Sequence, residues 1–236
     1  MQVSHISKDF SLDNVVPFFQ PIMDLSQGSV WRYECLARLL HFDQQSFVPA
    51  EFLFLIDRRQ SVARLTQIIF NSSANYFRNI NMAWNVNVSL EDMLDPEIAL
   101  FMRAQLQHYP DPGRISLEVT ASNALENPEV FADFSEFCRS LGLGIILDHF
   151  DLCEWELQQV CDLPINGIKV SANFVQNIAS QPGLREGLDY LIARAGQRKI
   201  ELIAEHIETP EVLAAMRDFG FRYAQGFYLS KPQPAI

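Results

Sequence analysis

The stretch LGIILDHFD, residues 143–151, largely decides how the rest of the chain can be interpreted. Its first half is apolar and predicts a β-strand that is buried on both faces. Asp148, His149 and Asp151 follow directly, and a charged group at the end of a buried strand is costly unless another group pairs with it. The stretch therefore predicts a polar site at the end of a buried strand, with a partner for Asp148 from elsewhere in the chain.

The composition fits one globular domain with a sizeable core. The chain has 236 residues, of which 48% are hydrophobic and 20% charged, and its formal net charge is −11. No basic stripe is available to replace phosphate counterions, which argues against binding to a nucleic-acid polymer. A small anionic ligand fits this charge if a metal ion or a few placed cations offset the acidic groups.

The N-terminus and the cysteines favour a cytoplasmic protein without membrane association. The opening MQVSHISKDFSLDN is too polar for a secretory signal, and no apolar run approaches the length of a membrane span. Cys35, Cys138, Cys153 and Cys161 show neither CxxC pairing nor zinc-like spacing. We therefore expect four reduced thiols.

Strand-like and helix-like segments alternate along most of the chain. Two apolar runs, 15–25 and 30–40, flank the turn signal SQGS and predict an opening β-hairpin. Asn127 and Thr209 are expected to be N-caps of two of the helices, with Gly142 near the end of the first. The remaining segments are expected as strands at 82–90, 114–122, 143–150, 167–171, 201–207 and 221–227, and as helices at 49–79, 95–109, 127–142, 153–161, 182–199 and 209–220.

This rhythm predicts a parallel sheet, either closed as a barrel or open and doubly wound. No GxGxxG or P-loop motif follows a strand, which disfavours the open dinucleotide-binding alternative. The hairpin would place one strand antiparallel to its neighbours. We expect an α/β fold close to a (β/α)8 barrel.

Polar residues recur near the C-terminal ends of successive predicted strands, one strand–helix unit apart. In a barrel these ends converge on one mouth, where enzymes of this architecture carry their chemistry. On the hairpin, Glu34 alternates with Arg32, Leu36 and Arg38 along one face of its strand. The strand-end residues are Asn87, Glu118, Asp148, Lys169, Glu205 and Gln225.

Four acids that converge in a low-dielectric mouth would repel one another strongly. A divalent cation would remove this repulsion, and sets of carboxylate and amide oxygens suit Mg²⁺ or Mn²⁺ better than zinc. Asp148 is then expected to pair with the metal, or with Lys169 if no metal is bound.

The same residues carry a resemblance to the EAL domain, a family of bacterial cyclic di-GMP phosphodiesterases. FFQPIMDL is similar to the family's opening strand, and YECLARL matches the motif that names the family, with Cys35 in place of alanine. NVNVS, LEVTAS, ILDHFD, GIKVSANF, IAEHIET and QGFYLSKP match its later motifs in order. The resemblance covers the chain from about residue 15, so we expect an N-terminal extension over 1–14 and an EAL domain over 15–236.

The resemblance implies a modified TIM-type (β/α)8 barrel with an antiparallel first strand, often paired as a homodimer. It also implies hydrolysis of cyclic di-GMP to the linear dinucleotide pGpG with Mg or Mn as cofactor. Lys169 would orient the attacking water or stabilise developing charge, and Glu205 would complete the acidic cluster. The implied ligands of one metal are Glu34, Asn87, Glu118 and Asp148, and the implied contacts of the nucleotide are Gln20, Leu36, Arg38 and Gln225.

Several positions depart from the family's usual pattern. His149 stands where a second aspartate would hold a second metal, and imidazole can bind Mn²⁺ or Zn²⁺ but brings no negative charge and suits Mg²⁺ poorly. Ala121 replaces a glutamate that anchors the following loop, Ser171 replaces an aspartate, and His206 replaces a glycine. The loop itself, normally rich in glycine and serine, reads DLCEWELQQV.

These departures leave three functions open. The favoured one is a degenerate EAL protein that binds cyclic di-GMP, a protein partner, or both, with absent or weak hydrolysis. The second is an active Mg- or Mn-dependent phosphodiesterase in which His149 replaces the usual second aspartate. The third is a regulator whose pocket is vestigial and whose surface alone docks on a protein partner.

Overall fold

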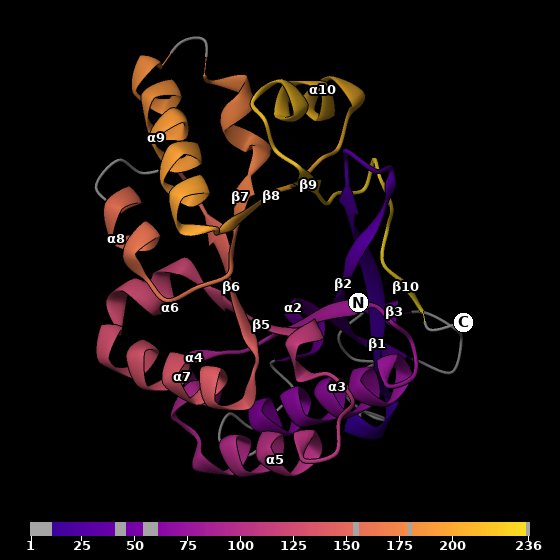
Figure 1. Cartoon of the computed structure of the whole chain (residues 1–236). Coiled ribbons are helices and arrows are strands. Elements are labelled where there is room, and N and C mark those ends of the chain that lie inside the picture. The colour runs from indigo at the N-terminus through magenta and orange to yellow at the C-terminus, as the bar shows by residue number, and fades with distance from the viewer. Residues whose placement is uncertain (1–10, 41–45, 54–60, 153–155, 179–180, 235–236) are drawn as a thin grey trace.

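The computed structural model describes residues 11–40, 46–53, 61–152, 156–178 and 181–234. Within these ranges, eight strands close into a barrel in the order β1-β2-β4-β5-β6-β7-β8-β9, and β9 pairs back with β1. Two short strands, β3 and β10, extend the sheet beside β2 and β1 (Figure 1). The strands are β1 Val15–Asp24, β2 Ser29–Leu40, β3 Ser46–Phe47, β4 Ala83–Asn87, β5 Ile115–Thr120, β6 Gly144–Phe150, β7 Gly167–Ser171, β8 Glu201–Glu205, β9 Tyr223–Ala224 and β10 Gln233–Pro234.

The helices lie on the outside of this barrel (Figure 1). Neighbouring helices pack against one another as well as against the strands, as α3 does with α5 and α8 with α9. The α-helices are α2 Pro49–Phe52, α3 Ser61–Phe77, α4 Leu90–Leu94, α5 Pro96–Leu106, α6 Ala121–Glu126, α7 Pro128–Leu141, α8 Leu157–Asp162, α9 Pro182–Arg198 and α10 Pro210–Asp218. Short 3₁₀ helices are η1 Leu12–Asn14, η3 Pro112–Arg114 and η4 Ala172–Gln176.

The expected fold class, a (β/α)8-type barrel with an antiparallel first strand, is confirmed. β1 runs antiparallel to both of its barrel neighbours, β2 and β9, whereas the pairs from β2–β4 to β8–β9 are parallel. The predicted opening hairpin is the β1–β2 pair, with its turn at 25–28. Closure of the sheet gives each barrel strand one face toward the helices and one toward the interior.

Strand alternation separates these two faces residue by residue. In β5, Ile115, Leu117 and Val119 belong to the large outer core, whereas Ser116 and Glu118 lie on the other face of the strand. The outer core contains stacked and edge-on aromatic rings, among them Trp84 against Phe70 and Phe77. Although its sequence is half polar, β5 is therefore buried from Ile115 to Val119.

The barrel interior has its own small apolar cluster. Ile22, Ile146, Ile203 and Tyr223 are buried together, and Trp31 stacks on Tyr223 with ring centroids 3.8 Å apart. These side chains fill the interior as in other barrels of this class, so the barrel is a packed core and not a channel. The polar site described below is built on the residues that follow along the same inward faces.

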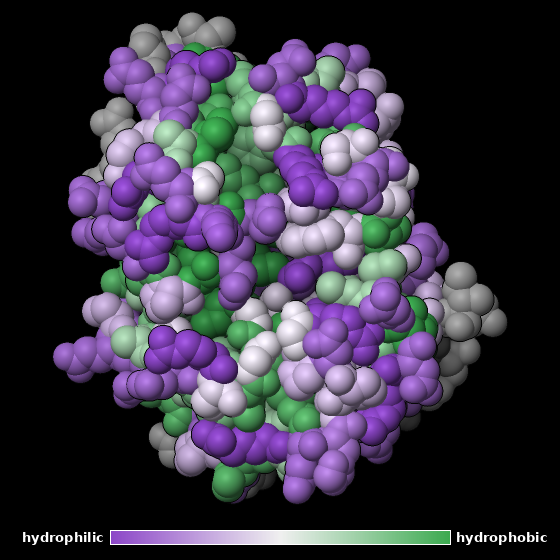
Figure 2. All heavy atoms as spheres, viewed as in Figure 1, coloured by the Kyte–Doolittle hydropathy of each residue, from purple (hydrophilic) through white to green (hydrophobic). Residues whose placement is uncertain are grey.

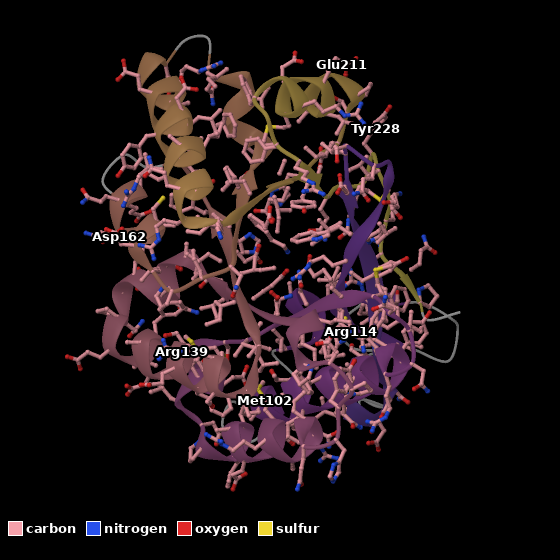
Figure 3. The ribbon with its side chains drawn as sticks, in the orientation of Figure 1. Met102, Arg114, Arg139, Asp162, Glu211 and Tyr228 are labelled. Carbon is pink, nitrogen blue, oxygen red and sulfur yellow. The ribbon has the colours of Figure 1, made fainter. Side chains whose placement is uncertain are left out.

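Polar contacts join some of the outer helices. Asp162, which Figure 3 labels at the end of α8, accepts hydrogen bonds from Arg194 at 3.0 Å and from Arg198 at 3.2 Å, both on α9. These side chains are between 32% and 47% exposed, so the contacts contribute little to stability, on the order of 1 kcal/mol or less for each pair. The apolar core determines the arrangement of these helices.

Several local expectations need correction. The helix expected at 153–161 begins at Leu157, and residues 153–155 lie outside the described ranges, as do 54–60 of the helix expected at 49–79. The strand expected at 221–227 is reduced to two residues, because the chain bends at 226 and turns at 227–229. Asn127 is at an N-cap position, but its side chain donates to the carbonyl of Asn123 and does not cap α7.

Other expectations of the same kind are confirmed. Thr209 caps α10 through a hydrogen bond from the Val212 N–H to its hydroxyl, and Gly142 ends α7 in a left-handed conformation with φ 74°. Cys35, Cys138 and Cys161 are free thiols in the core, and Cys153 lies outside the described ranges.

The surface is polar on the face shown in Figure 2, where hydrophilic residues cover the outer sides of the helices and hydrophobic residues appear mainly in the recesses between them. In the described part of the chain, no helix is both long enough and apolar enough to cross a membrane.

We predict that Gly226→Ala destabilises the fold. A β-carbon at Gly226 would collide with the backbone of Ile207, which cannot move aside as a flexible side chain could. Such overpacking costs about 1–3 kcal/mol or more in the free energy of unfolding, measured by urea denaturation. The control is Gly196→Ala, an exposed α9 position with no atom within 4 Å, where up to about 1 kcal/mol of stabilisation is expected. Equal midpoints for the two variants would contradict the prediction.

Candidate functional site

The site is built around the buried ammonium group of Lys169. Its Nζ lies 2.8 Å from Glu34 Oε2, 2.8 Å from Glu118 Oε2 and 3.6 Å from Asp148 Oδ1. These four residues come from β2, β5, β6 and β7, and the side chain of Lys169 is 1% exposed. The structure thus brings together carboxylates that the sequence places up to 114 residues apart, at the strand ends where the barrel rhythm predicts a site.

Amide side chains hold the oxygen atoms of Glu34 in place. Asn87 donates to Glu34 Oε1 at 3.0 Å, and Gln225 donates to Glu34 Oε2 at 2.6 Å. With the Lys169 contact, this carboxylate has a partner on each oxygen. Gln20, on the adjacent β1, donates to the carbonyl of Ser230 at 3.0 Å and so fixes the C-terminal segment beside the site.

Glu118 is held from below by a chain of polar side chains inside the barrel. Asn85 donates to Glu118 Oε1 at 2.7 Å, and Arg32 in turn donates to Asn85 Oδ1 at 2.6 Å and to Ser116 Oγ at 2.7 Å. Because Lys169 takes the other oxygen, Glu118 is fully paired and its side chain is 0% exposed. It forms the floor of the site.

The centre of the site holds more carboxyl groups than cations. The pKa values of these carboxyl groups are therefore shifted in different directions. Burial opposes the charge on Lys169, but Asp148, Glu118 and Glu34 together raise its pKa well above the usual range. Burial also acts on Glu34, yet Lys169 and the amide donors outweigh it and lower its pKa to about 2. The pKa of Glu118 is raised by burial and by the charge of Glu34, and that of Asp148 is raised by burial.

Two histidines border the acidic centre. His149 lies 3.5 Å from Asp148 Oδ2 and 3.7 Å from Glu205 Oε1, and His206 Nδ1 also lies 3.7 Å from Glu205 Oε1. The interaction with Glu205 raises the pKa of His149 to about 9, although its side chain is 63% exposed, which moderates any such effect. The same interaction helps to lower the pKa of Glu205 against the effect of burial.

A cavity of about 330 Å³ opens over this arrangement. It brings together nine of the eleven residues singled out from the sequence. These nine are Gln20, Glu34, Leu36, Asn87, Asp148, His149, Lys169, Glu205 and Gln225.

The two other sequence-derived residues lie elsewhere. Glu118 contacts Lys169 but is covered by it, and it borders a second cavity of about 530 Å³ instead. Arg38 also lines that second cavity; its guanidinium donates to the Ala37 carbonyl at 2.8 Å and does not reach the first cavity. Leu36 and Asn87 line both cavities, so the two adjoin.

The structure adds residues that the sequence-based choice of site residues left out. Glu208, Gly226 and Phe227 line the first cavity from the segments after β8 and β9, and His206 does so beside Glu205. Asn85 supports Glu118 from the same strand face as Asn87. The alternation in WNVN could have identified Asn85, whereas loop residues carry no periodic signal that would identify them.

The donor set fits a divalent cation. Asp148 Oδ1 and Glu205 Oε1 are buried oxygen atoms without a hydrogen-bond partner, and buried polar atoms are rarely left in that state. Asp148, His149 and Glu205 each present a ligand atom within 4.8 Å of the others. Glu34, Asn87 and Asp148 offer oxygen atoms of the type that Mg²⁺ and Mn²⁺ prefer.

Comparison with known proteins gives a family match over residues 4–232, to the EAL domain. The cyclic di-GMP phosphodiesterase RocR of Pseudomonas aeruginosa is 26% identical over 226 residues, which are 92% of this chain and 57% of RocR. The cyclic di-GMP phosphodiesterase PA2567 of the same organism is 28% identical over 221 residues, 91% of this chain and 38% of that protein. The chain therefore spans about 57% and 38% of the lengths of these relatives.

Solved structures share the fold. The MucR phosphodiesterase in its c-di-GMP complex superposes with a TM-score of 0.84 at 22% identity, over 100% of this chain and 98% of that one. The EAL domain of FimX from Pseudomonas aeruginosa, bound to c-di-GMP, gives a TM-score of 0.79 at 22% identity, over 99% of this chain and 95% of that one. With the family match over nearly the whole length, the closed mixed barrel and the acids gathered at its strand ends, the chain belongs to the EAL domain family.

Proposed function

We propose that this EAL domain binds cyclic di-GMP at the mouth of its barrel and hydrolyses it weakly or not at all. The proposal is supported by its relatives, which are named cyclic di-GMP phosphodiesterases, and by structural neighbours described as c-di-GMP complexes. The cavity over Lys169 and the adjoining one beside Arg38 together offer room for a ligand with two nucleotide halves.

Recognition of a phosphate in this cavity needs more positive charge than the side chains supply. Lys169 is the only lysine or arginine among the described residues that line it, and its ammonium already contacts Glu34 and Glu118 at 2.8 Å. A divalent cation, when bound, supplies charge stabilisation at a phosphate and activates water for in-line attack. Glu34, Asn87 and Asp148 are the residues that would hold it, with Lys169 and Glu118 beneath them.

The observation that carries the proposal of weak hydrolysis is the position of His149. Its imidazole lies between Asp148 and Glu205, 3.5 and 3.7 Å away, where a carboxylate would help to hold a second hard cation. An imidazole adds no negative charge there, and a protonated one repels a cation. Loss of one ion from a two-metal site removes several kcal/mol of transition-state stabilisation, and each 1.36 kcal/mol is about tenfold in rate.

A second function, active Mg- or Mn-dependent phosphodiesterase, is favoured by one observation. Three carboxylates expected around the first metal lie within 3.6 Å of the Lys169 ammonium group, namely those of Glu34, Glu118 and Asp148. A purely vestigial pocket has no physical need for this arrangement, because buried charges are expensive to keep. Both functions predict that cyclic di-GMP binds, and they differ in how fast it is hydrolysed.

We expect the purified protein to bind cyclic di-GMP and to form pGpG far more slowly than about one turnover per second, the lower end of ordinary enzyme rates. Calorimetry measures the binding, and chromatography of the product measures turnover in Mg²⁺ and, separately, in Mn²⁺. Turnover near one per second in Mg²⁺ would favour the active phosphodiesterase, and absence of binding would leave docking on a protein partner as the function.

The His149→Asp variant sharpens this test. The backbone at His149 has φ 55°, a conformation that aspartate also tolerates, so the substitution needs no backbone change. We expect at least about tenfold faster product formation in Mg²⁺, because a second carboxylate would complete an oxygen ligand set. The control is His108→Asp, at an exposed position outside the cavity. Equal rates for His149→Asp and the unaltered protein would show that His149 does not limit hydrolysis.

We predict that Arg38→Ala weakens the binding of cyclic di-GMP about tenfold, since a hydrogen bond to a charged group contributes roughly 1.5–3 kcal/mol. Arg38 lines the cavity that adjoins Lys169, where its guanidinium is half-buried beside Phe18 and can turn toward a bound ligand. Calorimetry compares this variant with Arg139→Ala, an exposed arginine on α7. Unchanged affinity in Arg38→Ala would show that the ligand does not extend into the second cavity.

A further inference from the structure

A groove between α4, α5 and α7 lies on the outside of the barrel, where these three helices contact one another (Figure 1). Ile98 and Phe134 are its buried residues from α5 and α7, and the half-buried Phe137 lines it beside them. The groove encloses about 190 Å³. Among the described residues that line it, Asp92 alone also borders the cavity beside Arg38, so the groove is a surface separate from the barrel mouth.

Two leucines extend the apolar surface of this groove into solvent. Leu94 lines the groove at the end of α4 and is 59% exposed. Leu100 is 67% exposed, more than any other large hydrophobic residue in the described part of the chain. It lies one helical turn after Pro96, which lines the groove, so the two are neighbours on the surface of α5. A single exposed leucine is ordinary, whereas exposed leucines beside an apolar recess are typical of interaction sites.

The charge at the edge of the groove is mainly negative. Asp95 and Asp133 line it from opposite sides, at the start of α5 and on α7. Neither carboxylate forms an ion pair with a cation in the described ranges. One basic residue, Arg103, lies against the groove, with its guanidinium 5.2 Å from the Phe137 ring. Glu97 and Glu129 are exposed on the same two helices. The surface is therefore complementary to a positively charged partner.

Asp92 gives independent evidence that the groove receives a polar group. Its side chain is buried at 2% exposure, and burial raises its pKa. Oδ2 accepts hydrogen bonds from the hydroxyls of Thr66 at 2.8 Å and Ser89 at 3.0 Å, whereas the buried Oδ1 has no partner in the described part of the structure. An unsatisfied buried oxygen is costly, and a donor group from a bound partner would satisfy it.

The size of the groove indicates what kind of partner it takes. A volume of about 190 Å³ is below the usual range for small-molecule sites, roughly 300–1,000 Å³. It has room for one or two apolar side chains. Protein segments that present such side chains from one face, at positions i and i+3 or i+4, are amphipathic helices.

We propose that the groove between α4, α5 and α7 docks an amphipathic helix of a partner protein. Apolar side chains of that helix enter the groove beside Leu94, and its lysine or arginine residues face Asp95 and Asp133. Docking of this kind needs no nucleotide, so it stands or falls separately from the function proposed above.

The probe is a set of fluorescein-labelled synthetic helical peptides. One face carries lysines, and the other carries leucines at i and i+4 or at i, i+3 and i+7. We expect at least one of them to raise its fluorescence anisotropy on binding, with an affinity that falls as salt increases, because exposed charge pairs are screened. Peptides with glutamate in place of lysine should not bind.

Two variants test the two components of the surface. Leu94→Gln removes apolar contact area and should weaken binding at least about fivefold. Asp133→Lys reverses a charge at the edge of the groove and should weaken it at least about tenfold. Both side chains are exposed, so we expect the urea denaturation midpoints to stay close to that of the unaltered protein.

The matched controls lie on α9, away from the groove. Glu186→Lys makes the same charge reversal at an exposed position, and Tyr190→Gln removes an exposed ring. Both should bind the peptide like the unaltered protein. The proposal is overturned if no lysine peptide binds, or if Leu94→Gln and Asp133→Lys bind as tightly as their controls. Neither result bears on the cyclic di-GMP measurements, which concern the barrel mouth.

Discussion

One buried ammonium group among three carboxylates is the constraint on which the structure depends. Lys169 reaches Glu34 and Glu118 at 2.8 Å and Asp148 at 3.6 Å, inside a barrel whose walls are closed by apolar packing. Loss of one member of a buried charge group leaves an uncompensated charge and typically costs about 3–5 kcal/mol. These four residues lie on four different strands, so the charge group links those strands at the same end of the barrel. Fold and candidate site therefore share a single electrostatic requirement.

A second cation, Arg32, extends this requirement into the barrel interior. It lies beside the apolar cluster of Ile22, Ile146, Ile203 and Tyr223, its guanidinium 4.3 Å from the Trp31 ring. Through Asn85 it fixes the oxygen of Glu118 that Lys169 does not contact. Burial opposes the charge on this guanidinium and lowers its pKa to about 10, yet the group stays charged at neutral pH. The Glu118 carboxylate is thus positioned by hydrogen bonds to both of its oxygen atoms.

Regular features of the sequence predicted most of this arrangement. The strand–helix rhythm predicted the barrel, and the turn signal SQGS predicted the antiparallel hairpin, because period and turn chemistry are local properties. The strand-end positions and the hairpin predicted six of the cavity residues for the same reason, whereas Gln20, Leu36 and His149 were identified as site residues through the EAL resemblance. Long side chains were less predictable: Arg38 shares a strand face with Glu34, but its guanidinium turns to the Ala37 carbonyl. Phe227 lines the cavity from a turn, where sequence periodicity does not indicate which way a side chain points. Asn127 is at an N-cap position, but its side chain donates a hydrogen bond to the carbonyl of Asn123 and does not cap the helix.

At His149 and His206 the backbone conformation would also suit other residues, whereas the side chains determine which atoms the site presents. His149 and His206 stand where the EAL pattern usually has aspartate and glycine, and their φ values of 55° and 61° suit those residues as well. The strand ends therefore keep a conformation that an oxygen-ligand site would also use, while the side chains present nitrogen. Below the rim, Glu34, Asn87 and Asp148 still present oxygen. One cavity thus combines the oxygen atoms of Glu34, Asn87 and Asp148 with the imidazole nitrogens of two histidines, and this mixed lining distinguishes it from a site made of oxygen ligands alone.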